Sequence, residues 1–412
     1  MPRAAERLVA PDLSVAIERS ADPSTAANVV ERLLEAHPAI ADELAASAIL
    51  RSSVVALACA SRSLSSAFVA DPQLLDPVRD ASAFHAERTE HDYVATWRAT
   101  EADDDQALRR WKRGEVVRIA ARDLLGVADM PAVGRELAAL ASVALDAALR
   151  RTSADAEVAI IGMGKLGGRE LNYSSDVDVL FVHSGNTEEA ERAAREVLAM
   201  MSATSADGIV FRTDANLRPE GRSGPLTRTL ESYQAYYERW GLIWEFQALL
   251  KARGVAGSSA LGERFVTMTR PFVWPESLDP DAVREIRAMK ERAESITDRK
   301  GLGDRELKRG RGGIRDIEFA VQLLQLVHGR DDHSVRSRTT LTALEELVGG
   351  DYVAPADADK LDDAYRFLRT VEHRLQLYDE QQTHTIPTDE AARIRLARVL
   401  GYRGGRARSE LD

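Results

Sequence analysis

Two carboxylates placed two residues apart are the side chains of this chain best suited to chemistry. Asp176 and Asp178 begin the segment DVDVLFVH, whose length and apolar residues predict a β-strand. Strand side chains alternate between faces, so both carboxylates should point to one face. Adjacent carboxylates repel unless a cation lies between them, and hard divalent ions prefer oxygen ligands. The pair therefore predicts a divalent-metal site, and the alternative is that two aspartates merely begin a strand.

A glycine-rich turn precedes these carboxylates. The β-rich segment Glu157–Ile161 runs into Gly162, Gly164 and Gly167, which match G-x-G-x-x-G. The backbone N–H groups of such a turn can approach a phosphate. A dinucleotide-binding crossover needs a helix of about ten residues or more, whereas only residues 165–175 separate this turn from the next strand. We therefore favour metal-assisted phosphoryl or nucleotidyl transfer over dinucleotide binding.

A third carboxylate is expected on a neighbouring strand. The segment Gly208–Leu217 alternates apolar and polar residues and predicts a strand. Its alternation places on one face Arg212, Asp214, Asn216 and Arg218. One aspartate among arginines suits a metal-and-anion site, and the alternative is a solvated strand face.

Basic residues elsewhere offer further anion contacts. Gly312 and Gly313 lie where a helix should begin, beside Lys308, and a helix N-terminus with basic neighbours binds anions readily. Arg315 lies on the polar face of this helix, which could equally be a solvated face. Lys251 could reach a phosphate or could be a solvated charge at a helix end.

Two other helical stripes have open roles. The aromatic residues Tyr233, Tyr237, Trp240 and Trp244 recur at helical spacing, and core packing is favoured over base stacking. In the segment YRFLRTVEHRLQL, a polar face opposite an apolar stripe expected to be core carries Arg366, Arg369, His373 and Gln376. The sequence leaves open whether that face is functional or structural.

The elements that must position these residues are mostly helical. Residues 1–150 are rich in helix formers, three short strands fall within 157–217, and helices follow. The expected later helices cover residues 226–253, 280–298, 314–328, 336–348, 358–379 and 388–400. We predict an α+β fold, mostly α, with an N-terminal helical region over 1–100, a nucleotidyltransferase domain over 101–265 and a C-terminal helical bundle over 266–412.

Composition narrows the classes of function. The 412 residues hold 55 Lys and Arg against 66 Asp and Glu, a net charge of −11, which disfavours nucleic-acid binding. The only cysteine, Cys59, excludes internal disulfides and multi-cysteine metal sites, and its apolar surroundings predict a buried thiol. The apolar stretches of the sequence are too short for a signal peptide or a membrane span. We expect a soluble, cytoplasmic protein with no membrane partner.

The segment GMGKLGGRELNYSSDVDVLF resembles the glycine-loop and D-x-D motif of glutamine-synthetase adenylyltransferase/adenylyl-removase enzymes, within the DNA polymerase β-like nucleotidyltransferase superfamily. The resemblance extends over about residues 100–400, through LRRWKRGEVVRIAARDLLG, RTDANLRPEGRSGPL, WEFQALLKAR, LKRGRGGIRDIEFAVQLLQL and YRFLRTVEHRLQL. It implies a small mixed sheet with helices, flanked by helical regions.

The family carries two opposed activities in two homologous halves. One half adenylylates a tyrosine of glutamine synthetase with ATP, and the other removes the AMP by phosphorolysis to give ADP. ELNYSSDVDVLF is more similar to the N-terminal, adenylyl-removase half, so the resemblance implies AMP removal by a chain that lacks the adenylyltransferase half. Adenylylation of glutamine synthetase is the first alternative, and a non-catalytic module that binds nucleotide or the PII signal protein is the second.

The resemblance also assigns residues and partners. It implies one or two Mg²⁺ ions held by Asp176, Asp178 and Asp214, which would also be the catalytic residues. It implies nucleotide or phosphate contacts (AMP moiety, ADP, possibly ATP) at Gly162, Gly164, Lys165, Gly167, Ser175, Arg212, Arg218, Lys251, Lys308 and Arg315. Glutamine synthetase would be the protein substrate and the PII protein a regulator. One departure is Asn216, where many family members have arginine, and it leaves one anion contact in doubt.

Overall fold

The computed structural model describes residues 12–100, 102–153, 155–276, 284 and 305–403. Contacts divide the chain into two units. Unit 1 is Met1–Leu137, Asn172–Ser174 and Arg369–Asp412, and unit 2 is Ala138–Leu171 and Ser175–Leu368. The division falls within two long helices, α11 (Met130–Arg150) and α20 (Pro355–Asp379). The predicted boundaries at residues 100 and 265 remain predictions.

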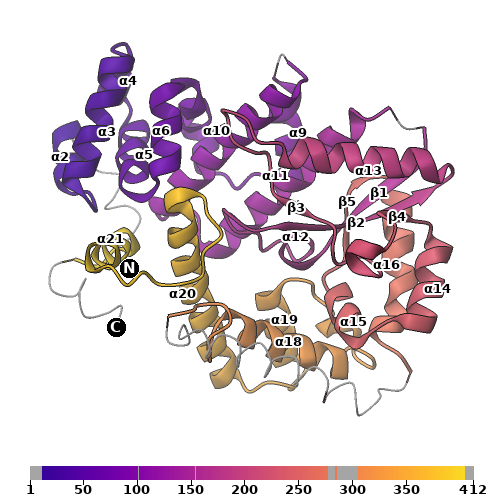
Figure 1. The fold of residues 1–412 in the computed structure, drawn as a ribbon. Coiled ribbons are helices and arrows are strands. Elements are labelled where there is room, and N and C mark those ends of the chain that lie inside the picture. The colour runs from indigo at the N-terminus through magenta and orange to yellow at the C-terminus, as the bar shows by residue number, and fades with distance from the viewer. Residues whose placement is uncertain (1–11, 101, 154, 277–283, 285–304, 404–412) are drawn as a thin grey trace. The chain divides into compact units, whose positions relative to one another are not determined.

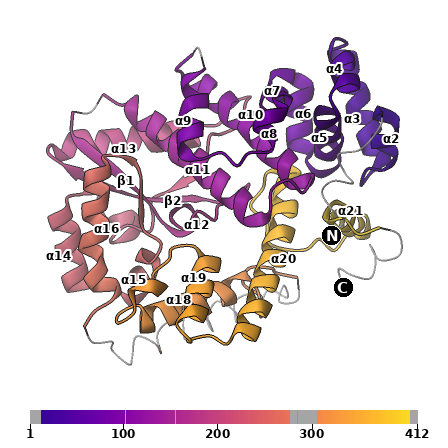
Figure 2. The ribbon, with the colours of Figure 1, turned by 180° about the vertical axis from the view of Figure 1, so that it is seen from behind.

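The elements assigned in the described part of unit 1 are all helices, joined by loops (Figures 1 and 2). Besides parts of α11 and α20, its helices are α2 (Leu13–Glu18), α3 (Pro23–Ala36), α4 (Ile40–Ala46), α5 (Ala48–Ala60), α6 (Arg62–Ala70), η1 (Pro72–Leu75), α7 (Asp76–Arg79), α8 (Ala81–Phe84), α9 (Glu90–Arg98), α10 (Asp105–Leu124) and α21 (Glu390–Leu400). Helix α5 packs against α3 and α10 and is buried almost along its whole length. It carries the predicted buried thiol, since Cys59 is 3% exposed.

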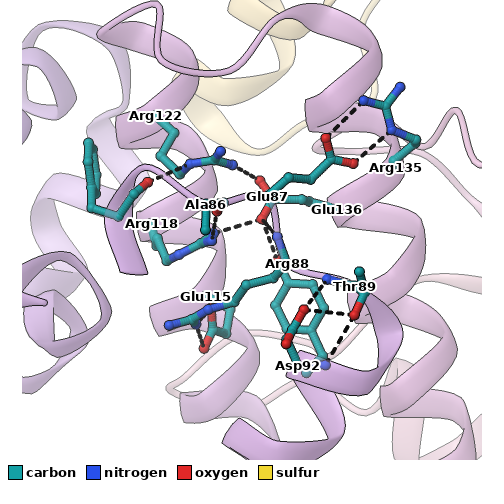
Figure 3. Close-up of polar contacts among 12 residues, drawn as sticks. Ala86, Glu87, Arg88, Thr89, Asp92, Glu115, Arg118, Arg122, Arg135 and Glu136 are labelled. Atoms are coloured by element: carbon teal, nitrogen blue, oxygen red, sulfur yellow. Dashed lines mark hydrogen bonds and ion pairs between the residues drawn. The ribbon is translucent and has the colours of Figure 1, made fainter. Parts of the chain in front are cut away.

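A cluster of buried charges ties helices α10 and α11 to the segment Phe84–Thr89 (Figure 3). Glu136 Oε1 accepts hydrogen bonds from Arg118 Nη1 at 2.8 Å and from the Arg88 backbone at 2.9 Å. Arg122 pairs with the other oxygen of Glu136 and donates to the carbonyl of Phe84 at 2.7 Å. Arg118 and Glu136 have fully buried side chains, so this part of LRRWKRGEVVRIAARDLLG is structural within unit 1.

Unit 2 holds the sheet and its covering helices (Figure 1). Its strands are β1 (Glu157–Gly162), β2 (Val177–Ser184), β3 (Thr213–Asp214), β4 (Thr227–Arg228) and β5 (Arg253–Gly257). Besides parts of α11 and α20, its described helices are α12 (Gly164–Gly167), α13 (Thr187–Ser202), η2 (Gly221–Ser223), α14 (Leu230–Trp240), α15 (Ile243–Leu249), α16 (Ser259–Val273), α18 (Ile314–His328), η3 (His333–Val335) and α19 (Thr340–Gly349). The helix predicted over 280–298 lies outside the described residues, apart from position 284.

The sheet is mixed, with the order β3-β2-β1-β5 and β4 also paired with β2. Strand β1 pairs antiparallel with β2 and β5, whereas β3 and β4 pair parallel to β2. The antiparallel β1–β2 pair excludes a βαβ dinucleotide-binding crossover here, because that unit requires parallel strands. The α+β, mostly helical fold is confirmed.

Two strand predictions need correction. The strand expected over Gly208–Leu217 is reduced to Thr213–Asp214, because the Asp214 side chain accepts the amide of Asn216 at 2.6 Å and turns the chain. Strand β4 was not predicted, and Arg253–Gly257 forms β5, although Arg253 was expected to be the last residue of a helix and no element was predicted directly after it. Its two glycines conceal the strand pattern.

The core of unit 2 lies between the sheet and helices α14 and α16. Ile161 and Leu180 from the sheet pack with Tyr233, Tyr237 and Phe265. The prediction that the aromatic stripe is core is therefore confirmed for the two tyrosines. It is wrong for Trp240 and Trp244, which are 71% and 37% exposed, because α14 ends at Trp240 and the chain turns away from the core.

No single helix in the described part of the chain has the length and apolar character needed to cross a membrane. Only α4 and α5 taken together meet those criteria, and they are bent by 109°.

Candidate active site

Strand pairing places two carboxylates side by side. Strand β2 pairs with β3 so that Asp178 lies opposite Asp214, and residues directly opposite in a sheet point to the same face. The Val177 amide donates to the Arg212 carbonyl at 2.9 Å and extends this pairing. On the other edge, the Met163 amide donates to the Asp178 carbonyl at 2.8 Å. The aspartate strand is thus fixed on both sides.

The electrostatics at Asp178 are those of crowded negative charge. Burial, followed by the nearby charges of Asp176 and Asp214, raises the pKa of Asp178 to about 7. The positive charges of Lys165 and Lys308 act on the same carboxyl and lower its pKa. Four other predicted site residues are therefore close enough to Asp178 to interact electrostatically with its carboxyl.

As placed, the carboxylates do not form a ready ligand cage. No group of three or more His, Cys, Asp or Glu among the described residues could hold a metal ion as it stands. Asp176 forms an ion pair with Arg212 instead, and Asp214 Oδ1 accepts the Asn216 amide. The Asp176–Arg212 contact makes Arg212 a partner of the carboxylates rather than a free anion contact in this arrangement.

The glycine turn has a steric explanation at two positions. Gly164 has a φ of +48°, and a Cβ there would lie 2.9 Å from Asp178 Oδ2. A Cβ on Gly167 would lie 1.9 Å from the Lys251 carbonyl oxygen and 2.5 Å from that of Gly162. Gly164 therefore lets the turn come close to the carboxylate, whereas close backbone packing is what requires glycine at position 167.

Lys251 has internal partners. Its ammonium group pairs with Glu170, donates to Thr340 Oγ1 at 3.0 Å, and is 8% exposed. The other Glu170 oxygen accepts the Thr340 amide at 2.6 Å. The contact with a phosphate expected for Lys251 stays a prediction, and the structure shows it joining the residues that follow the glycine turn to α19.

Three further residues that were predicted to contact nucleotide or phosphate lie in different surroundings. Arg218 donates to the carbonyls of Ala215 at 2.8 Å and Gly224 at 3.2 Å, which braces the loop after β3. Arg315 lies with its guanidinium 4.7 Å from the centre of the Phe319 ring, and burial lowers its pKa. Ser175 is half-buried directly before the aspartates.

Sequence reasoning missed Glu170, which holds Lys251 next to the glycine turn. The available signal was its position, because Glu170 is the only acidic residue between Gly162 and Asp176. Glu170 is 6% exposed. Because a carboxylate is seldom fully buried unless it is paired, the burial of Glu170 agrees with its ion pair to Lys251.

Comparisons with known proteins agree with the motif. The family model described as glutamate-ammonia ligase adenylyltransferase matches residues 51–268, and the one described as GlnD PII-uridylyltransferase matches residues 282–411. Proteins named bifunctional glutamine synthetase adenylyltransferase/adenylyl-removing enzyme are similar over nearly the whole chain. Those from Streptomyces avermitilis and Streptomyces coelicolor are 44% and 43% identical, each over 98% of this chain and 43% of its own length. That from Mycobacterium tuberculosis H37Rv is 40% identical over 95% of this chain and 41% of its own.

Proposed function

We propose, because this chain belongs to the glutamate-ammonia ligase adenylyltransferase family, that it removes AMP from an adenylylated tyrosine of glutamine synthetase by phosphorolysis. The chain spans less than half the length of the curated relatives. Their names include both an adenylyltransferase and an adenylyl-removing activity. The similarity of ELNYSSDVDVLF to the adenylyl-removase half is the reason for proposing removal.

One observation supports a transfer site more than any other. The pKa of Asp178 is raised to about 7 because its carboxyl is buried and because the charges of Asp176 and Asp214 lie close to it. A purely structural carboxylate would normally be paired with a cation or hydrogen-bonded until its pKa fell. Crowded carboxylates beside a glycine turn favour phosphoryl-group chemistry.

Carboxylate oxygens are the donors that Mg²⁺ prefers, and their mutual repulsion at Asp178 fits a divalent ion. We propose that Asp176, Asp178 and Asp214 hold one or two Mg²⁺ ions. A bound ion would polarise the phosphoryl oxygens and stabilise the departing tyrosinate. Arg212 pairs with Asp176 Oδ1, so the proposal places a cationic side chain directly beside the metal ligands, where it would also attract the phosphate.

In the proposed reaction an oxygen of inorganic phosphate forms a bond to the AMP phosphorus, and the bond from phosphorus to the tyrosine oxygen breaks. ADP forms, and the tyrosinate takes a proton from solvent. Phosphate is anionic near neutral pH, so its attack needs orientation more than a base. The turn at Gly164 and the ammonium groups of Lys165 and Lys308 are proposed to orient it.

The reverse assignment is the second candidate. The family model that covers residues 51–268 is described as an adenylyltransferase, and the same carboxylates would serve ATP-dependent adenylylation. The match of residues 282–411 to a PII-uridylyltransferase model supports keeping the PII protein as a proposed regulator.

Two parallel reactions test the proposal. The chain is mixed with adenylylated glutamine synthetase, Mg²⁺ and phosphate, and separately with unmodified synthetase, Mg²⁺ and ATP. We expect ADP in the first mixture and no modification in the second. Activity only in the second mixture would reverse the assignment, and activity in neither would remove it.

A further inference from the structure

The polar face of helix α20, whose role the sequence leaves open, holds a segment of unit 1 that leads directly into the aspartate strand. Residues Asn172–Ser174 belong to unit 1, whereas Leu171 before them and Ser175 after them belong to unit 2. Asp176 follows Ser174 by two residues. Whatever fixes these three residues also fixes the start of the chain path to the carboxylates.

Asn172 is held on both ends of its amide. Its Nδ2 donates to Glu372 Oε2 at 2.7 Å, while its Oδ1 accepts from Arg369 and lies 3.1 Å from His373 Nε2. Asn172, Arg369, Glu372 and His373 are each no more than 1% exposed. Burial and the Arg369 charge lower the pKa of His373 to about 3, so the ring is neutral and donates through Nε2.

Tyr173 and Ser174 are held as well. The Tyr173 hydroxyl donates to Asp123 Oδ2 at 2.9 Å, and Arg374 pairs with the same carboxylate. The Ser174 amide donates to Gln376 Oε1 at 3.0 Å. Gln376 is fully buried, and its Nε2 has no hydrogen-bond partner among the described residues. Within the described part of the chain, the Gln376 side chain therefore has one hydrogen bond, which it accepts from the Ser174 backbone.

A buried glutamine that accepts one hydrogen bond from a loop backbone adds little stability to a core, because its own N–H groups are left without hydrogen bonds. The arrangement is better explained by a requirement for one loop conformation. We propose that the polar face of α20 positions the aspartates for the transfer reaction through Asn172–Ser174, with Gln376 and His373 as positioning residues. The kinetic part of this inference rests on the proposed function.

Gln376→Met tests the inference, since it keeps the side-chain length and removes the acceptor of the Ser174 amide. We expect kcat to fall by about tenfold or more, with KM for adenylylated synthetase and for phosphate within about twofold of wild type. Gln376→Glu retains an acceptor oxygen and should recover most of the lost kcat. If Gln376 had a purely structural role, the fall in activity would instead be proportional to the loss of folded protein.

Tyr93→Phe is the matched control. Tyr93 is fully buried in the same unit, and its hydroxyl donates to Glu136 rather than to residues 172–174. This variant should lower the unfolding midpoint slightly and leave kcat unchanged. An equal fall in kcat in Tyr93→Phe would overturn the inference.

Hydrogen exchange followed by mass spectrometry provides a readout independent of turnover. Peptides that cover residues 172–180 should exchange about tenfold faster in Gln376→Met than in wild type, and at the wild-type rate in Tyr93→Phe. Wild-type exchange in Gln376→Met would overturn the inference. If wild-type protein catalyses neither reaction, the proposed function fails, while the exchange result still decides whether α20 fixes this segment.

Discussion

At the scale of a single residue, the pKa of Asp178 is unusually high for a carboxyl group. Its pKa of about 7, against an ordinary 3.8, means that between these pH values the folded chain binds a proton that the unfolded chain has lost. The free energy of unfolding therefore decreases as pH rises from about 4 to 7. Asn cannot ionise, so Asp178→Asn should abolish transfer and raise the free energy of unfolding at pH 8 by about 1–3 kcal/mol.

Chemical unfolding at pH 8 and pH 4, without divalent ions, measures this prediction, and the difference between variant and wild type should disappear at the lower pH. Asp331→Asn is the control, because Asp331 is exposed and its pKa is lowered by Arg330. A lower unfolding free energy for Asp178→Asn at pH 8 would contradict the electrostatic account.

Gly167 makes a steric prediction. A Cβ at this position would overlap the carbonyl oxygens of Lys251 and Gly162. Gly167→Ala should therefore lower the unfolding free energy by about 3 kcal/mol, as measured by urea unfolding. Gly349→Ala, where a Cβ meets nothing within 4 Å, should cost less than about 0.5 kcal/mol. Equal effects would mean that close packing does not explain Gly167.

At the scale of elements, the Lys251–Glu170 pair links the residues after the glycine turn to α15, β5 and α19. Removing one partner of a buried ion pair leaves an uncompensated charge and typically costs about 3 kcal/mol. We expect Lys251→Met and Glu170→Gln each to lose about that much, and the double variant to lose clearly less than their sum. Additive losses in urea unfolding would show that the two groups do not interact.

Helix α20 predicts an acid sensitivity. The pKa of His373 is about 3 in the folded chain against an ordinary 6.5, so the unfolded chain binds the extra proton between these values. Stability is fully present above about pH 6.5 and is lost as pH falls toward 3, by up to about 1 kcal/mol per pH unit.

His373→Gln should flatten this part of the stability profile, because glutamine takes up no proton. The control is His91→Gln, an exposed histidine of the same unit. Thermal unfolding at pH 7, 6 and 5 measures both variants, and an unchanged slope in His373→Gln would assign the acid sensitivity to other groups.

At the scale of the whole molecule, the sequence predicted the parts of the fold that follow local periodicity. The strands at Glu157 and Val177, the helix from Ile314 and the mixed α+β class were accessible because apolar residues recur at strand or helix spacing. The short length of β3 could not be predicted, since a turn formed by the Asp214 side chain ends the strand. The division into units could not be predicted either, because Asn172–Ser174 join unit 1 through hydrogen-bond partners about 50 and 200 residues away in the sequence.

The candidate site likewise has features that the sequence predicts and features that it does not. Residue types and spacing predicted the aspartates, and the β2–β3 register aligns Asp178 with Asp214. They could not predict that Arg212 pairs with Asp176 or that Lys251 is buried against Glu170. Those pairings depend on segments brought together only by the folded chain.

One labelling experiment tests the central claim most directly. Glutamine synthetase carrying radiolabelled AMP on its tyrosine is incubated with the chain and Mg²⁺, with phosphate in one tube and pyrophosphate in another. Phosphorolytic removal predicts that the label appears in ADP, only with phosphate and only in wild type rather than Asp178→Asn. Label in ATP with pyrophosphate, and none in ADP, would show instead that the site runs the adenylylation reaction and would contradict the account.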